Sequence, residues 1–279
     1  MSDRSHRGNK CSSRQSTKYH GTSAIIDARE LFGNLGQSDE RQSRTHVEFK
    51  AYPRIKRTKL PRTIPPRRDL WQLLESRHSS RRFSSMGISL FELSILLRSV
   101  GIITATPKGK TARAWDRTRR TYASAGARYP IEVYVALLRG KDIPRGVYHY
   151  NIREHSLEAL ASRLVTDSFV HATGEEWVAK ADCAIILAAI FGRSQTKYGE
   201  RGYRYVLLEA GHIMQNLCLA TQTLGLGLCP FGGFVDHEVN ALIDVDGYNE
   251  AAVYIGFVGV EAPERSDHPR GFDRVVTKD

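Results

Sequence analysis

Two segments in the first third of the chain carry apolar residues at helical spacing. In residues 69–77 the leucines fall on one face, which predicts a short helix. Ser89 followed three positions later by Glu92 is a capping-box pattern, in which each side chain bonds the backbone amide of the other residue. This pattern predicts a second helix over 89–100, which Gly101 would end.

The longest helical pattern runs over residues 203–224. Apolar residues recur there every three or four positions from Val206 to Leu224, and further apolar residues flank this stripe. Such a pattern is typical of a helix that is buried on more than one side. We therefore expect a long central helix, in the core or at a dimer interface, that ends at Gly225.

Short apolar runs rich in β-branched residues predict the strands of a buried sheet. These runs lie at 131–138, 184–191 and 251–259. Residues 146–152 and 156–160 are predicted to form a strand pair joined by a turn, and 236–243 a short capped helix. The polar, basic stretch 104–122 is predicted to be a loop. Helices interleaved with strands in this way predict an α+β or α/β fold.

The first 68 residues differ in composition from the rest. Residues 1–44 are rich in Ser, Arg, Gly and Gln, so we expect a disordered basic tail with at most a short helix at 24–32. Residues 45–68 contain four prolines, which disfavour helix in the preceding residue and predict an extended arm. A globular domain would then occupy 69–262, followed by a C-terminal tail over 263–279.

The net charge of +11 is concentrated before residue 69. Residues 1–68 hold 16 Lys and Arg against 6 Asp and Glu, whereas the remaining residues hold 25 against 24. A basic tail can bind nucleic acid or an acidic protein, or can be merely solvated. Because the domain itself is close to neutral, we do not expect nucleic acid as its partner.

Nothing in the sequence predicts export or membrane insertion. There is no run of 18 uncharged apolar residues, and the N-terminus lacks the apolar stretch of a secretory signal. The four cysteines are far apart and form no CxxC pair, which favours reduced thiols over a disulfide framework or a zinc site. We therefore expect a cytoplasmic protein without a metal site.

Lys197 and Tyr198 place an amine and a phenol side by side just before the long helix. A lysine can act as a base when its ammonium group is desolvated, and a tyrosine hydroxyl can pass a proton. The pair is therefore a candidate for acid–base chemistry. The alternative is a solvated lysine beside a surface aromatic residue.

A basic segment follows the first predicted helix. Arg77 and Arg81 stand four residues apart with Ser79 between them. Two forked cations and a hydroxyl can converge on one phosphate group. The alternative is a solvated basic helix end that complements the helix dipole.

Two segments of small residues could approach a flat ligand closely. One is 124–130, which leads directly into the strand at Ile131. The other is 228–234, whose Pro-x-Gly-Gly turn could present unhindered amide donors. Each could also be an ordinary connector.

Taken together and in this order, these segments resemble the flavin-dependent nitroreductase family, and within it the SagB-type azoline dehydrogenases of thiazole/oxazole-modified peptide biosynthesis. The segments that carry the resemblance are SRHSSRRF (76–83), SAGARYPIEVYV (124–135), GVYHYNIREHSLEAL (146–160) and KYGERGYRYVLLEAGHIMQN (197–216). Tyr122 stands where this family often has proline. The resemblance covers roughly residues 46–260.

The resemblance implies a nitroreductase-like α+β fold, with a central mixed or antiparallel sheet surrounded by helices, and an interlocked homodimer that binds FMN at its interface. The residues implied to hold FMN are Arg77, His78, Ser79, Arg81, Ser124, Ala125, Gly126, Arg128, Gly232 and Gly233. The first four would bind the phosphate and ribityl chain, and the next four would reach the flavin from the neighbouring subunit. The two glycine amides would face the reactive ring nitrogen.

The implied reaction is the oxidation of thiazolines or oxazolines in a precursor peptide to the aromatic azoles, with Lys197 or Tyr198 as the base. The resemblance also implies partnership with cyclodehydratase subunits in a synthetase complex. No GxGxxG motif follows a strand, so a Rossmann dinucleotide site is not expected. Two alternatives remain: a small-molecule nitroreductase or flavin oxidase of the same fold, and a non-catalytic basic adaptor that recruits precursor peptide.

Overall fold

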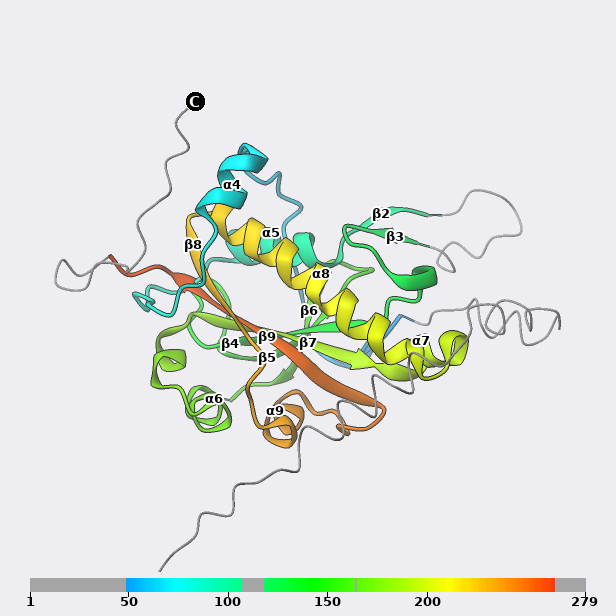
Figure 1. The fold of residues 1–279 in the computed structure, drawn as a ribbon. Coiled ribbons are helices and arrows are strands. Elements are labelled where there is room, and N and C mark those ends of the chain that lie inside the picture. Colours follow the sequence, from blue (N-terminus) through cyan, green and yellow to red (C-terminus); the bar gives the residue numbers. More distant parts are fainter. Residues whose placement is uncertain (1–48, 107–117, 164, 264–279) are drawn as a thin grey trace, which may run out of the picture.

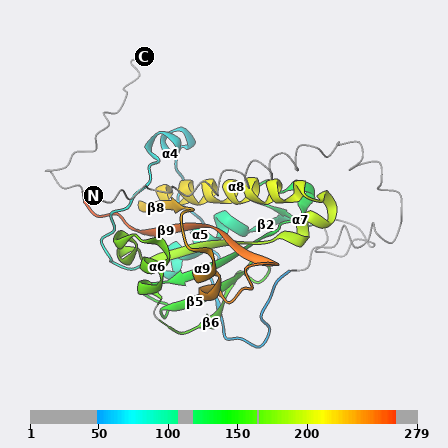
Figure 2. The same cartoon turned by 60° about the horizontal axis from the view of Figure 1, so that its bottom comes forward.

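The computed structural model describes residues 49–106, 118–163 and 165–263, so the predicted tail over 1–44, its helix at 24–32 and most of the C-terminal tail lie outside the described residues. The described chain forms three layers (Figures 1 and 2). Helices α5 (Leu90–Gly101) and α8 (Arg201–Thr223) cover one face of a central sheet. Helices α6 (Thr166–Thr173) and α9 (Asp236–Ile243) cover the other face.

The central sheet has seven strands in the order β1-β6-β5-β4-β7-β9-β8, and every neighbouring pair is antiparallel. In this order the strands are Arg57–Lys59, Ser156–Ala161, Gly146–Asn151, Ile131–Leu137, Cys183–Ile190, Glu250–Val260 and Leu226–Phe231. The predicted antiparallel sheet surrounded by helices is confirmed, while the dimer stays a prediction. A second, two-stranded sheet pairs β2 (Ile103–Ala105) with β3 (Arg119–Arg120). Both of its strands touch or fall within the stretch predicted to be a loop.

The central strands read as continuous apolar runs because both faces of the sheet are covered. In β4, Val133 and Val135 pack in the cluster beneath α5 and α8. Tyr134 and Ala136, which alternate with these valines along the strand, pack in the cluster formed with α6 and α9. Successive side chains point to opposite faces of a strand, so a strand between two helical layers needs apolar residues at every position.

The predicted helices are present with small shifts at their ends. The first is α4 (Leu70–Ser76), and α5 begins with the capping box formed by Ser89 and Glu92. Helix α7 (Phe191–Tyr198) was not predicted. Lys197 and Tyr198 stand just before α8, as expected, but they form the last turn of α7 rather than part of a loop. Helix α6 was also not predicted.

Helix α8 lies along the sheet with one face buried, and the opposite face is exposed in the single chain. Leu207 and Leu208 on that face are 43% and 53% exposed. The expectation of burial on several sides is therefore not met within one chain. No helix in the described part of the chain is both long enough and apolar enough to cross a membrane.

The Pro-x-Gly-Gly turn predicted within 228–234 was wrong for its first half, because Pro230 and Phe231 belong to a strand. The first four residues of the segment 228–234 belong to β8, which forms an edge of the sheet and pairs with β9. Only Gly232 and the residues after it lie beyond the strand. At an edge, Pro230 can be accommodated because its missing amide removes no bond to an inner strand.

Candidate functional site

Lys197 and Tyr198 pack against Gly126 of the segment 124–130. A Cβ atom added at Gly126 would lie closer than 3.0 Å to both Tyr198 Oη and Lys197 Nζ. Gly126 also has a φ of +60°, a conformation that favours glycine. Lys197 Nζ lies 5.1 Å from the centre of the Tyr198 ring. The structure thus brings together two segments that sequence analysis singled out separately.

Lys197 and Tyr198 are surrounded mainly by other side chains rather than by solvent. Tyr198 is 9% exposed, and its ring meets the edge of Tyr205 at 4.9 Å between centroids. Lys197 is half-buried. Water is therefore partly excluded from both side chains.

The segment 124–130 has a strained backbone. Besides Gly126, the non-glycine residues Ala127 and Tyr129 have φ values of +53° and +46°. Such conformations persist only where surrounding contacts hold them. Ser124 Oγ accepts a hydrogen bond from the Tyr129 amide at 2.9 Å, and the Arg128 Nε donates to the Arg193 carbonyl at 2.6 Å. The second bond fastens the segment to α7.

Two buried glutamates flank this segment and were missed by sequence analysis. Glu132, in β4, forms an ion pair with Arg193 at 2.5 Å and contacts His149 Nε2 at 3.1 Å. Burial by itself would raise the pKa of Glu132, but Arg193 and His149 lower it to about 2. This carboxylate is therefore charged at neutral pH.

Glu209, in α8, is 2% exposed. Burial raises its pKa to about 7, although a hydrogen bond from the Ser124 side chain, the charges of Arg120 and Arg193 and the Ile131 amide act against this rise. Its Oε1 atom is buried and has no hydrogen-bond partner within the described ranges. Glu209 thus contacts the first residue of the segment 124–130 and the residue that directly follows it.

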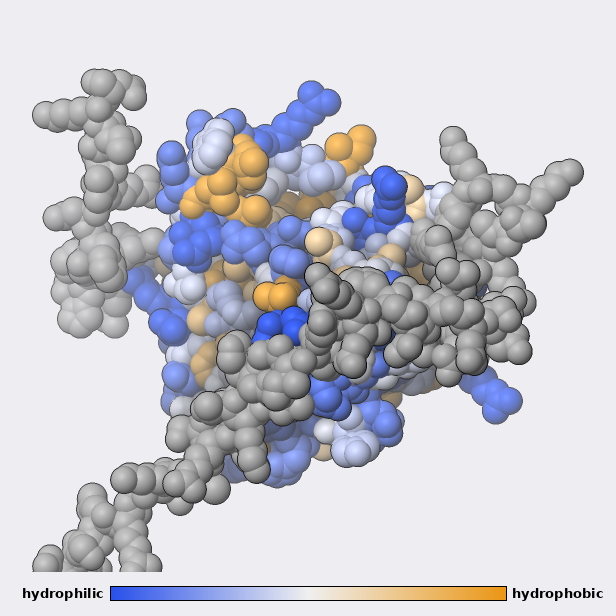
Figure 3. All heavy atoms as spheres, turned by 45° about the vertical axis from the view of Figure 1, so that its right-hand side comes forward, coloured by the Kyte–Doolittle hydropathy of each residue, from blue (hydrophilic) through white to orange (hydrophobic). Residues whose placement is uncertain are grey.

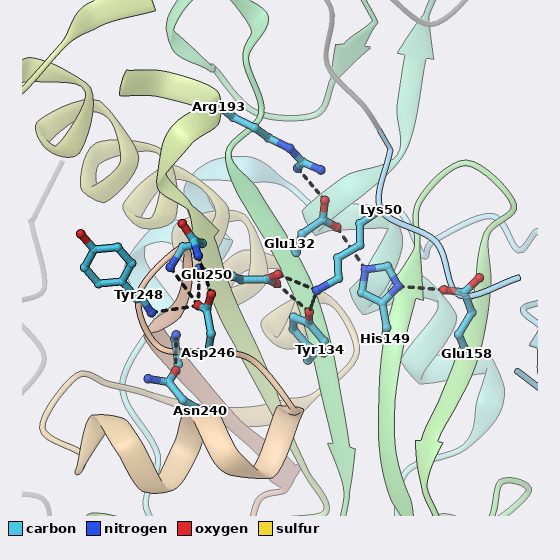
Figure 4. A network of polar contacts seen from close by, with 12 residues as sticks. Lys50, Glu132, Tyr134, His149, Glu158, Arg193, Asn240, Asp246, Tyr248 and Glu250 are labelled. Atoms are coloured by element: carbon cyan, nitrogen blue, oxygen red, sulfur yellow. Dashed lines mark hydrogen bonds and ion pairs between the residues drawn. The ribbon is translucent and has the colours of Figure 1, made fainter. Parts of the chain in front are cut away.

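Figure 4 shows the network to which Glu132 belongs. Glu132, His149 and Glu158 lie on the adjacent strands β4, β5 and β6, and His149 is bonded to a carboxylate through each ring nitrogen. A sequence signal for it existed, because these are polar residues inside otherwise apolar strands. The strand register needed to connect them was not available from the sequence.

The basic segment 77–81 follows the end of α4 in extended backbone. Its Ser80 amide donates to the Leu228 carbonyl at 2.9 Å, which fixes the segment beside β8. Arg77 is half-buried and lies near Cys218, while Ser79 and Arg81 are exposed. The Arg81 side chain contacts the Cys229 thiol. Arginine and serine donors therefore gather at the junction of α4, α8 and β8.

His78 behaves differently from its neighbours. Its Nδ1 contacts the Ser76 carbonyl at 3.0 Å, and its Nε2 contacts Glu261 Oε1 at 2.9 Å. Both ring nitrogens are thus engaged with the protein, so His78 ties this segment to the end of β9.

Gly232 and Gly233 lie exposed just beyond β8. A Cβ atom added at Gly232 would meet nothing within 4 Å. The backbone is therefore accessible there, as close approach of a planar ligand requires. Permanent cations, a hydroxyl and open glycine amides form a donor set that suits a flavin mononucleotide.

The two groups of candidate residues lie toward opposite ends of α8 (Figure 1). Lys197, Tyr198 and Gly126 are near its first residue, Arg201, whereas Arg77 is near Cys218. At 1.5 Å per residue, Arg201 and Cys218 are about 25 Å apart along the helix. One chain therefore does not bring all the predicted site residues together.

Two clefts lie near these groups, but none of the predicted site residues lines either of them. One has a volume of about 410 Å³ and lies between the proline-containing arm, α4, α5 and α8. The other, of about 330 Å³, lies beside α7 and is lined by Phe191, Gly192, Gln195, Tyr203, Tyr248 and Asn249. Hydrophobic side chains also reach the surface near the top of the molecule, over α4 (Figure 3).

Comparison with known proteins gives a consistent family. Residues 74–260 match the sequence profile of the Nitroreductase family. The protein MJ1384 of Methanocaldococcus jannaschii, whose name describes it as a nitroreductase, is 33% identical to this chain over 181 residues. These residues cover 64% of this chain and 86% of MJ1384.

Two further similarities are to a peptide-processing system. The microcin B17-processing protein McbC of Escherichia coli is 31% identical over 147 residues, which cover 50% of this chain but only about half (54%) of McbC. The E. coli microcin synthetase McbBCD complex, solved with truncated pro-MccB17 bound, contains a chain with the same fold. That chain has a TM-score of 0.55 and 24% identity, over 92% of this chain and 99% of its own length.

Proposed function

Because the chain belongs to the nitroreductase family, an oxidoreductase family, we propose that it is an FMN-dependent dehydrogenase that oxidises thiazolines and oxazolines of a precursor peptide to thiazoles and oxazoles. The observation that carries the proposal is the position of Lys197 and Tyr198, side by side against Gly126. The similarity to a microcin-processing protein supports the peptide substrate.

The residues present fit the cofactor. Arg77, Ser79 and Arg81 would bind its phosphate, and the amides of Gly232 and Gly233 would meet its ring. A bound flavin supplies the acceptor for one hydrogen and two electrons from the substrate.

The protein's own task in this reaction is to orient the ring and remove a proton. An azoline becomes an azole by losing two hydrogens from neighbouring ring atoms, one with its electron pair and one as a proton. Lys197 Nζ or Tyr198 Oη would take the proton. Aromatisation of the ring provides driving force, so correct placement of this base is the main requirement on the protein.

We also propose that the active unit is a homodimer. The phosphate-binding group and the Lys197 group lie toward opposite ends of α8, and the exposed face between them carries Leu207 and Leu208. A two-fold partner packed on this face would bring the phosphate group of one subunit to the Lys197 group of the other. Sedimentation of the flavin-bound protein as a monomer would contradict this.

The peptide substrate further suggests a complex with the cyclodehydratase that makes the azoline. The fold is shared with a chain of a microcin synthetase complex, which supports this assignment. Copurification with such a subunit, with and without residues 1–44, would test whether the tail contributes.

The decisive experiment replaces the two candidate bases separately. Lys197→Ala and Tyr198→Ala should keep their flavin absorbance but lose about 10²–10⁴-fold in azole formation, as expected for a lost general base. Peptides should accumulate that are two hydrogens heavier for each missing oxidation, as the stoichiometry of azole formation requires. Exposed Lys180→Ala and Tyr248→Ala are matched controls and should behave as the unaltered protein.

The same experiment separates the alternatives. Loss of flavin in both base variants would make the pair structural. Full azole yield in both would mean that Lys197 and Tyr198 have no catalytic role. A flavin-bound protein that reduces nitro compounds with a nicotinamide donor but leaves azoline peptides unchanged would be a small-molecule nitroreductase. A protein that purifies without flavin and does not bind added FMN would be an adaptor.

A further inference from the structure

Five charged side chains alternate in sign across four strands and end on α7. They are Arg57, Glu158, His149, Glu132 and Arg193, which we call the charge ladder. The contacts, in this order, are 3.1, 2.9, 3.1 and 2.5 Å. The first four residues lie on β1, β6, β5 and β4, which are consecutive strands of the sheet. Figure 4 shows the part of the ladder from Glu158 to Arg193.

The centre of the ladder is closed to solvent. The side chains of His149 and Glu158 are 0% exposed, and that of Glu132 is 7% exposed. With a carboxylate on each ring nitrogen, His149 can donate from both, which favours the imidazolium form. Burial lowers the pKa of His149, but the two carboxylates more than offset this and raise it overall. Each charge is thus compensated by its neighbours.

The proline-containing arm completes this enclosure. Tyr52 covers His149 with a ring contact of 5.2 Å, and its amide donates to Glu158 Oε2 at 3.0 Å. Lys50 bonds Glu250 at 2.5 Å and Tyr134 Oη at 2.6 Å beside the ladder (Figure 4). The arm therefore provides both the first charge of the ladder and the lid over its middle.

At the other end, Arg193 holds α7 to the segment 124–130 in two ways. Its side chain donates to the Tyr129 carbonyl at 3.0 Å while it pairs with Glu132. Its own carbonyl accepts the bond from Arg128. Arg193 precedes Lys197 by four residues, about one helical turn, so a rotation or shift of α7 at Arg193 would move Lys197 as well.

From this arrangement we infer that Arg193 and Glu132, supported by His149, are positioning residues that fix α7 so that Lys197 and Tyr198 remain against Gly126. The inference rests on the proposed function for the role of Lys197 and Tyr198. Its physical basis is that a buried charge left without its partner is strongly unfavourable, so no member can move without cost to the next. The ladder therefore transmits the rigidity of the sheet to a short helix.

The test uses Arg193→Met in the full-length protein, with exposed Arg145→Met as the control. We expect azole formation to fall about 10²-fold, as misplacement of a reacting group by about 1 Å can cause. Flavin content should not change. In flavin-free protein, deuterium exchange of residues 191–198 should become faster while that of β7 stays the same, since only α7 loses its anchor.

A second measurement separates positioning from a general structural role. In a background that already carries Lys197→Ala and Tyr198→Ala, adding Arg193→Met should cost little further activity, because residues that act as a unit are not additive. The same fold-loss in both backgrounds, or unchanged exchange of residues 191–198, would overturn the inference.

Arg193→Lys keeps the experiment informative if Arg193→Met does not fold. It retains the charge but not the forked guanidinium that reaches both Glu132 and the Tyr129 carbonyl, so a smaller loss and a smaller rise in exchange are expected. Wild-type values of both quantities for Arg193→Lys would overturn the inference. If Lys197→Ala and Tyr198→Ala themselves retained the full rate, the proposed function would fail. The exchange measurement would still show whether the charge ladder fixes α7.

Discussion

Glu132 and Glu209 are buried carboxyl groups on two sides of the same strained segment, and their ionisation is opposite. Two cationic partners lower the pKa of Glu132 to about 2 against the effect of burial. Arg120 and Arg193 also act on Glu209, but their effect does not offset its burial, which raises its pKa to about 7. The contrast shows that the balance between burial and close cationic partners decides whether a buried acid is charged.

The two groups therefore contribute to stability in opposite pH ranges. A lowered pKa means that Glu132 stabilises the fold above its ordinary value of 4.5, and that this contribution is lost as the pH falls toward 2. A raised pKa means that Glu209 is most compatible with the fold below 4.5, and that stability is lost as the pH rises through about 7. One side of the segment is held by a fixed charge and the other by a group that titrates near neutrality.

The largest effect should come from removing the fixed charge. Glu132→Ala leaves buried His149 and partly buried Arg193 without their shared partner, which should cost about 3–5 kcal/mol of unfolding free energy. Denaturant unfolding at pH 7 measures this, and half-exposed Glu154→Ala is the control, with a cost within about 0.5 kcal/mol. A loss below about 1 kcal/mol for Glu132→Ala would mean that the ladder adds little to stability.

A somewhat smaller effect is expected from Glu209→Gln, and it should depend on pH. The rise of the Glu209 pKa from 4.5 to about 7 corresponds to about 3 kcal/mol of stability that the unaltered protein loses between these pH values. The variant keeps an acceptor oxygen but cannot ionise, so its unfolding free energy should not show this loss. Parallel stability curves for the two proteins from pH 4.5 to 8 would contradict the assignment.

The smallest of the three effects tests the segment itself, independently of both acids. Gly126→Ala introduces a Cβ atom at a φ of +60° and against Tyr198 and Lys197, which should cost about 1–3 kcal/mol. Azole formation should fall as well, because the two side chains must move. Gly192→Ala, in the same helix as Lys197 and with nothing near its added Cβ atom, should instead be neutral or stabilising by up to about 1 kcal/mol. Equal stability of the two variants would show that the segment 124–130 can change its conformation at little cost in free energy.

Much of the fold could be predicted from local pattern. The apolar period of α8, the capping box before α5 and the continuous apolar runs of β4 and β7 each indicated the right element. Strand β8 was missed because Pro230 and two glycines suggested a turn, and only its edge position explains why proline is accepted there.

The candidate site, like the fold, could be predicted from the sequence only in part. Lys197, Tyr198 and the segment 124–130 were visible as motifs, but their contact through Gly126 was not. His149 looked like part of a hairpin, and its role between two glutamates depends on the register of three strands. Contacts between residues far apart in sequence follow from topology, which local patterns do not contain.

The length of α8 makes the proposed dimer open to subunit complementation. If each site combines Arg77 and Arg81 of one chain with Lys197 of the other, two inactive variants can rescue one another. A mixed dimer of Arg77→Ala/Arg81→Ala and Lys197→Ala chains would hold one site with both defects and one with none. Random pairing of equal amounts would then restore about a quarter of the full activity from two inactive proteins. A site assembled within a single chain would regain nothing on mixing.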